Sequence, residues 1–147
     1  MITRRDALVA ALAALIAGAA VTWAQSPAKP IMHSTVFDWE KMKVETTKPG
    51  ERRGVFDSPV ATLDRLECHI TTLNPGEQPH DPHQHPEEEM LFVKEGTLDI
   101  MQNGDHQRVG PGSVVFNASN EVHGFRNVGE TKATYWVLKW YTPKATK

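Results

Sequence analysis

The strongest constraint on the fold is the alternation of short β-forming segments with turn sequences along most of the chain. Strands are predicted at residues 36–39, 54–57, 63–73, 89–94, 97–102, 107–109, 113–116 and 133–141. Clusters such as Asn74-Pro75-Gly76 and Asn103-Gly104 separate them. Beyond the first 24 residues, no segment shows an apolar period of 3.6 residues over three helical turns. The pattern therefore predicts an all-β antiparallel sandwich or barrel.

The first 24 residues are typical of an export signal. Arg4 and Arg5 precede an apolar, Ala-rich run that ends in Thr22-Trp23-Ala24, and cleavage is expected after Ala24. The paired arginines resemble a twin-arginine signal, with a general secretory signal as the alternative. The run is shorter than the roughly 20 residues of a spanning helix, so we expect no stable membrane insertion of the mature form. We predict a periplasmic or secreted protein with a signal at 1–24, a tether at 25–35 and one domain at 36–147.

Charge and composition restrict the partners of this domain. Sixteen Lys and Arg residues stand against eighteen Asp and Glu residues, and no arginine-rich stretch is interleaved with aromatics. Nucleic acid is therefore not an expected partner. A chain of 147 residues can enclose a core and a small pocket. Because Cys68 is the single cysteine, no intramolecular disulfide can form.

A cluster of histidines and glutamates carries the clearest chemical signal. His80, His83 and His85 fall within six residues, and a run of three glutamates ends at Glu89. On an extended segment residues i and i+2 project to the same side, so His83 and His85 can offer two nitrogens to one ion. Glu89 can add an oxygen, and His123, 34 residues further on, would return from another strand to close the site. A solvated polar loop is the alternative interpretation of the cluster.

The spacing of these residues resembles both sequence motifs of the cupin superfamily. The first is matched by His83-x-His85-x3-Glu89-x6-Gly96, and the second by Gly112-x5-Ala118-x-Asn120-x2-His123-x3-Asn127. Ala118 replaces the usual proline, Gly76 stands one residue too far from His83, and Asn120 replaces a glycine whose left-handed backbone asparagine tolerates. The resemblance covers about residues 60–141. It implies a cupin-type antiparallel jelly-roll β-barrel in which His83, His85, Glu89 and His123 bind a metal.

Three imidazole nitrogens and one carboxylate oxygen form a mixed donor set. Such a set suits a divalent Mn, Fe, Co, Ni or Zn ion and argues against Ca or Cu(I). Mn or Fe is favoured, because export of an already folded protein would let these weakly held ions load in the cytosol. Four protein ligands leave coordination positions open, as a catalytic metal site requires.

Several further residues allow both a structural and a functional interpretation. Cys68 is in phase with Leu66 and Ile70, so it is predicted to face the apolar side of its strand, with a thiol near the metal as the alternative. The opposite phase is predicted to lie on the outer face and contains Glu67, His69 and Thr71. Loop or solvated positions are preferred over roles in binding or catalysis for His80, Glu87, Glu88 and Arg126.

Two classes of function remain open at this stage. The resemblance implies a small metalloenzyme, such as a dioxygenase, decarboxylase or isomerase, acting on a small oxygen-bearing molecule. The alternative is a cupin module that binds a small ligand or metal without turnover, since one fold hosts many activities. In Met90-Leu91-Phe92-Val93 both strand phases are apolar, and Met90 and Phe92 need cover from a second sheet or subunit, so a homodimer is expected.

Overall fold

The computed structural model describes residues 29–143, and the predicted export signal lies outside them. The described chain forms one short 3-10 helix, η1 (Trp39–Lys41), followed by β-strands. The strands are β1 (Val44–Thr47), β2 (Gly50–Val60), β3 (Leu63–Leu73), β4 (Glu88–Glu95), β5 (Leu98–Gln102), β6 (Asp105–Val109), β7 (Val114–Asn117), β8 (His123–Asn127) and β9 (Ala133–Tyr141). Within residues 29–143 no helix has the length and hydropathy needed to span a membrane.

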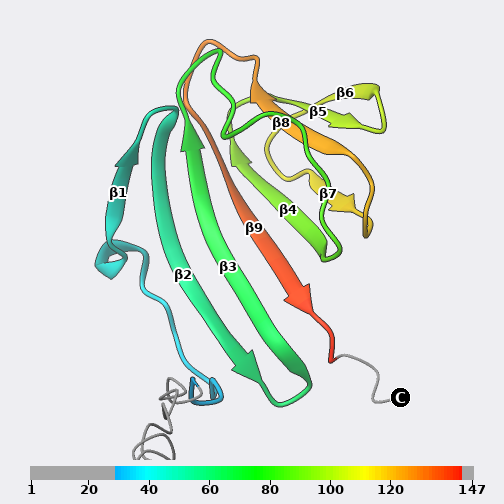
Figure 1. Ribbon diagram of the computed structural model, residues 1–147. Coiled ribbons are helices and arrows are strands. Elements are labelled where there is room, and N and C mark those ends of the chain that lie inside the picture. Colours follow the sequence, from blue (N-terminus) through cyan, green and yellow to red (C-terminus); the bar gives the residue numbers. More distant parts are fainter. Residues whose placement is uncertain (1–28, 144–147) are drawn as a thin grey trace, which may run out of the picture.

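The strands form two antiparallel sheets. One has the order β1-β2-β3-β9-β4-β7 and the other the order β6-β5-β8. Figure 1 shows β2, β3, β9 and β4 as long curved strands side by side, with β5, β6 and β8 gathered beyond β4 near one end. Because β9 is inserted between β3 and β4, both ends of the domain contribute to the centre of the large sheet. The predicted all-β jelly-roll architecture is confirmed.

The sequence pattern misplaced or missed several short elements of the domain. No strand forms over residues 36–38, where the chain instead enters η1, with the Asp38 side chain accepting a hydrogen bond from the Glu40 amide at 3.1 Å. Strand β1 is exposed at every residue, so it lacks the apolar alternation that reveals a strand. Strand β8 is short and contains a glycine, which weakens its β signal.

The hydrophobic core lies between the two sheets. Leu73, Leu91 and Leu98 have no exposed surface, and Tyr135 is nearly as deeply buried. Phe125 of β8 packs edge-on against Tyr135 of β9 with ring centroids 6.0 Å apart, which links the small sheet to the large one.

The prediction that Glu67, His69 and Thr71 of β3 lie on the outer face is wrong. His69 and Thr71 line a cavity on the inner side of the large sheet, and Glu67 is buried with its carboxylate 2.7 Å from His69, whereas Ile70 is buried in the opposite phase. That second face is covered in part by the segment before β1, where Trp39 packs on Trp136, the neighbour of Ile70 in the sheet. The apolar residues of β3 therefore lie on its outer face, which this segment partly covers, and polar residues on its inner face line the cavity.

Candidate metal centre

The fold brings the four predicted ligands together from separate positions in the chain. His83 and His85 lie on the segment between β3 and β4, Glu89 lies near the start of β4, and His123 begins β8. His83 and His123 form an isolated antiparallel bridge in which each backbone amide donates to the other residue's carbonyl, at 3.0 and 2.9 Å. This bridge ties the histidine segment to the small sheet and holds His83 beside His123.

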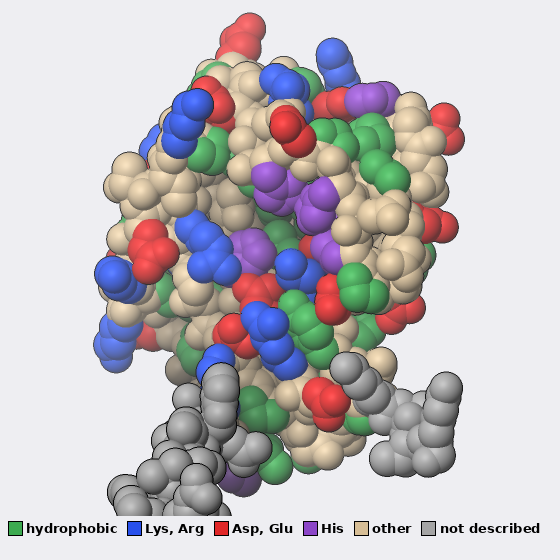
Figure 2. Space-filling view, viewed as in Figure 1, with side chains coloured by type: hydrophobic (Ala, Val, Ile, Leu, Met, Phe, Trp, Pro, Cys, Tyr) green, Lys and Arg blue, Asp and Glu red, His purple; other side chains and the backbone are tan. Residues whose placement is uncertain are grey.

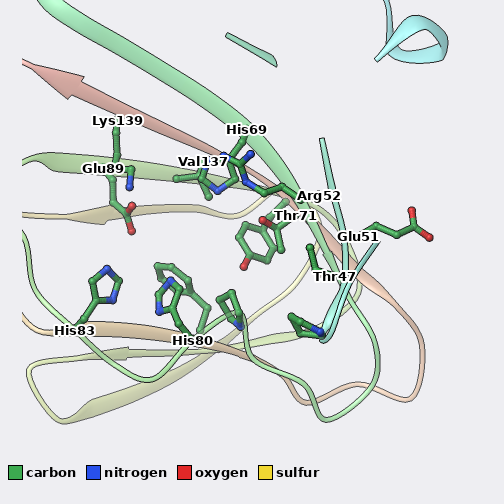
Figure 3. Close-up of a pocket in the computed structure, with 14 residues that line it drawn as sticks. Thr47, Glu51, Arg52, His69, Thr71, His80, His83, Glu89, Val137 and Lys139 are labelled. Carbon is green, nitrogen blue, oxygen red and sulfur yellow. The ribbon is translucent and has the colours of Figure 1, made fainter. Parts of the chain in front are cut away.

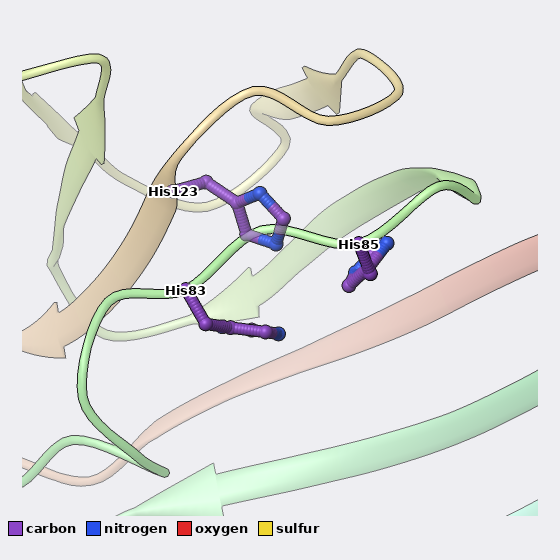
Figure 4. A group of neighbouring side chains, drawn as sticks. All are labelled: His83, His85 and His123. Carbon is purple, nitrogen blue, oxygen red and sulfur yellow. The ribbon is translucent and has the colours of Figure 1, made fainter.

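The three imidazoles point toward one another, as Figure 4 shows. One nitrogen from each ring can be chosen so that all lie within 4.8 Å of one another. The Nδ1 atoms of His85 and His123 bond to the backbone carbonyls of Glu87 and Glu121, at 2.8 and 2.9 Å. A neutral ring bonded to a carbonyl in this way keeps its proton on Nδ1 and leaves the Nε2 lone pair available, as metal-binding histidines commonly do.

Buried nitrogens without hydrogen-bond partners test whether the site fits a metal ion. Nε2 of His85, Nε2 of His123 and Nδ1 of His83 are all buried and accept or donate no hydrogen bond within the described chain. Unpartnered polar atoms in a protein interior are costly and rare. A cation bound among the three rings, whose ligand atoms lie within 4.8 Å of one another, would explain why these nitrogens lack partners. The site therefore fits a divalent metal ion.

Glu89 supplies a carboxylate at the same place and is only 3% exposed. Its Oε1 lies 3.2 Å from Nε2 of His123, and its Oε2 lies 3.6 Å from Nε2 of His85. Asn117, its cross-strand neighbour on β7, donates a hydrogen bond to Oε1 at 2.9 Å. Gln102 in turn donates to the side-chain oxygen of Asn117 at 2.7 Å. The carboxylate is thus held in one orientation by a chain of amides.

The environment favours an ionised Glu89 and a neutral His83. Burial alone would raise the pKa of Glu89, but the close contact with His123 and the hydrogen bond from Asn117 outweigh it and lower that pKa to about 2. Burial lowers the pKa of His83 to about 4, helped by the neighbouring histidines. Burial opposes a charge on His123, yet its contact with Glu89 raises its pKa. A carboxylate and a neutral imidazole are the protonation states that bind metal.

A cavity of about 340 Å³ opens beside this cluster. His80, His83 and Glu89 line its metal side, and residues of β2, β3 and β9 line the rest, among them Arg52 and His69. Figure 2 shows the histidines gathered in a hollow, with Lys and Arg side chains beside them. A cavity of this size admits a small molecule next to the metal position.

Other residues singled out in the sequence analysis take no part in the proposed metal site. Cys68 is buried in the phase opposite to His69, and burial raises the pKa of its thiol to about 11, so the interpretation of a reactive thiol near the metal is not supported. Glu88 accepts a hydrogen bond from the indole of Trp140 at 2.8 Å. Arg126 donates to the Gly76 carbonyl at 3.0 Å and to Gln78, so it fastens the loop after β3.

The motif residues without ligand roles shape the loops that carry the ligands. Asn120 has a φ of 60°, the left-handed conformation that its replacement of glycine requires. Asn127 is fully buried, donates to the carbonyls of Leu73 and Thr131 at 3.1 and 2.8 Å, and accepts from the Gly129 amide at 3.0 Å. These three bonds anchor the end of β8, the strand that carries His123.

Fold and site together define a small jelly-roll domain with a cluster of metal-type ligands at the mouth of its barrel. Residues 69–139 match the family model of the cupin domain. Residues 69–139 are therefore a domain of the cupin superfamily.

Solved structures agree with this fold. An RmlC-like cupin from Shewanella frigidimarina has a TM-score of 0.61 at 18% identity, covering 76% of this chain and 95% of its own. A polyketide cyclase from Streptomyces resistomycificus has a TM-score of 0.61 at 24% identity, covering 78% of this chain and 83% of its own. A predicted oxalate decarboxylase from Thermotoga maritima has a TM-score of 0.60 at 19% identity, covering 73% of this chain and 99% of its own. The comparison with curated proteins gives no match.

Proposed function

We propose that this protein binds one divalent metal ion through His83, His85, Glu89 and His123, and that it is a small metalloenzyme acting on a small oxygen-bearing molecule. The observation that carries the proposal is a cluster of three imidazoles, each with a buried, unpartnered nitrogen, that lies beside a buried carboxylate at a cavity. Mn or Fe is the favoured ion, and Zn, Ni or Co would suit the same donors.

A bound ion would supply Lewis-acid polarisation of a substrate oxygen placed in the cavity. The chain's own residues prepare the site for that chemistry. Asn117 fixes the Glu89 carboxylate, and the backbone carbonyls of Glu87 and Glu121 fix the tautomers of His85 and His123. The apolar side chains of Phe125 and Val137 also line the cavity.

The alternative is a binding module without turnover. Among the similar structures, one is a cyclase and one a predicted decarboxylase, which supports an enzyme in this superfamily without selecting a reaction. Metal-loaded protein incubated with small acids, sugars and phenols, with oxygen uptake and product formation followed, separates the two functions. Tight binding of a small molecule without any turnover would favour the binding module.

The metal assignment itself is tested by elemental analysis of protein purified from its native compartment. We expect about one ion per chain in the wild type and none in the His83→Ala, His85→Ala double variant. His80→Ala is the matched control, because its ring lies 4.3 Å from that of His83 and lines the same cavity. Stoichiometric metal in the double variant, or loss of metal in the control, would contradict the assignment.

We also propose that the mature protein is periplasmic or secreted and forms a homodimer. Support for export is the signal-like sequence of residues 1–24, with its paired Arg4 and Arg5. Support for a dimer is the outer face of the large sheet, where Phe92, Val114 and Phe116 are 40%, 58% and 49% exposed. A second copy of this face would cover them.

A further inference from the structure

The inner wall of the large sheet carries a group of cationic side chains that face the metal cluster across the cavity. Arg52 of β2, His69 of β3 and Lys139 of β9 all line this cavity. Figure 3 shows them on the side of the large sheet, with His80 and His83 on the opposite side. None of the proposed metal ligands belongs to this group. These side chains are therefore available to contact a small molecule bound in the cavity.

Glu67 contacts two members of this group, His69 and Arg52. It is 6% exposed, and its Oε1 lies 2.7 Å from Nδ1 of His69 and 3.3 Å from a guanidinium nitrogen of Arg52. Because an ionised carboxylate can only accept hydrogen bonds, Nδ1 of His69 must carry a proton and donate it. Glu67 thus fixes the ring and the guanidinium at the cavity wall, and one carboxylate charge is shared between two cationic-type groups.

Lys139 adds a charged ammonium group that forms no ion pair with the residues that the structure describes. In the sheet it stands between Glu67 of β3 and Glu89 of β4, yet no carboxylate within residues 29–143 lies within 4.0 Å of its ammonium nitrogen. Of the acids that line the cavity, Glu51 pairs with Lys132 at 3.1 Å and with Arg53 at 3.5 Å, and Glu89 is a proposed ligand of a divalent ion that would compensate its charge. With that ion bound, Lys139 would present positive charge to the cavity.

We propose that Arg52, His69 and Lys139 form a subsite for the carboxylate of a small organic acid, so that the substrate class of this protein is small carboxylic acids. The guanidinium, imidazole and ammonium donors match the acceptor oxygens of a carboxylate. The inference rests on the proposed function in one respect: the other oxygen-bearing end of the acid lies toward the metal cluster. A neutral sugar or phenol would provide no negative charge to pair with the Lys139 ammonium group.

The test is calorimetric titration of malonate, with malonamide as its uncharged counterpart of similar shape. Metal-loaded and chelator-treated proteins are each titrated, and metal content is measured separately for every variant. The variants are Lys139→Gln and Arg52→Gln. The matched control is Arg65→Gln, because Arg65 is ion-paired to Asp57 in the same sheet and does not line the cavity. Lys139→Gln breaks no ion pair, so it should leave the fold intact even if Arg52→Gln does not.

We expect malonate to bind wild type at least tenfold more tightly than malonamide. Lys139→Gln and Arg52→Gln should each weaken malonate binding at least tenfold while keeping their metal, and Arg65→Gln should stay within twofold of wild type. Unchanged malonate affinity in Lys139→Gln with metal retained would overturn the subsite. A wild type that holds no metal would contradict the proposed function instead. In that case the chelator-treated proteins decide the subsite: weaker malonate binding by Lys139→Gln than by wild type would support it, and equal malonate binding would overturn it.

Discussion

Replacement of Asn117 by leucine should weaken metal binding although Asn117 is not a metal ligand. Glu89 Oε1 has two close polar neighbours, the Asn117 amide at 2.9 Å and Nε2 of His123 at 3.2 Å. If Glu89 and Nε2 of His123 held a metal ion, the Asn117 amide would be the hydrogen-bond donor that orients the Glu89 carboxylate. Because Asn117 is only 1% exposed, water cannot readily take its place. Loss of such an orienting partner typically costs 10- to 100-fold in affinity, or about 1.4 to 2.8 kcal/mol.

The assay is a competition titration with a chromogenic zinc chelator, on wild type, Asn117→Leu and Gln102→Ala. Gln102 donates to the side chain of Asn117 and not to Glu89, so its removal should cost less than Asn117→Leu. Melting of the metal-free proteins, followed by circular dichroism, verifies that each variant is folded. A folded Asn117→Leu protein with zinc affinity within twofold of wild type would refute the orienting role.

Three further predictions concern pH, assembly and export. The metal-free protein should lose stability as pH falls from about 6.5 toward 4, because the fold disfavours the protonated form of His83. It should lose more from about 4.5 toward 2, because the fold favours the ionised form of Glu89. A melting temperature that is flat from pH 7 to 4 would contradict this. Light scattering should show a dimer at micromolar concentration. Val114→Asp should shift the protein toward monomer, because the substitution places a carboxylate in the apolar exposed face; a monomeric wild type would remove the dimer proposal. Changing Arg4 and Arg5 to Lys should leave folded precursor in the cytosol, whereas undiminished export would indicate the general secretory route.

The spacing of ligand-type residues was the most informative part of the sequence. An i, i+2 pair on an extended segment places His83 and His85 on one side whatever the details of the loop. The return of His123 from a distant strand followed from the motif resemblance, and the structure places it in a backbone bridge with His83. Asn120 also adopts the left-handed conformation that its place in the motif demands.

The side of β3 that faces the cavity could not be predicted in the same way. Hydrophobic patterning assumes that the apolar phase points inward, and it placed His69 and Thr71 outside. The interior beside these residues is a polar cavity, while Ile70 and Cys68 are buried on the other face, which the Trp39 segment partly covers. Where a barrel encloses a polar site, the usual rule for the buried phase reverses.

Residues that act through cross-strand register were also invisible in the sequence. Asn117 contacts Glu89 only because β7 pairs with β4 in one particular register. Lys139 approaches the site because β9 is inserted between β3 and β4. Such neighbours depend on strand order, which short-range patterns do not encode.

The measurement that tests the central claim most directly is a metal titration of His123→Ala beside wild type, with thermal melting followed in both. If the ion is held in the barrel by ligands from distant segments, His123→Ala should bind at least tenfold more weakly, a loss of about 1.4 kcal/mol or more. Metal should also raise the melting temperature of wild type more than that of the variant, because the ion binds the folded state. Equal affinity and an equal metal-dependent melting shift would show that His83, His85 and Glu89 chelate metal locally and that His123 is not a ligand.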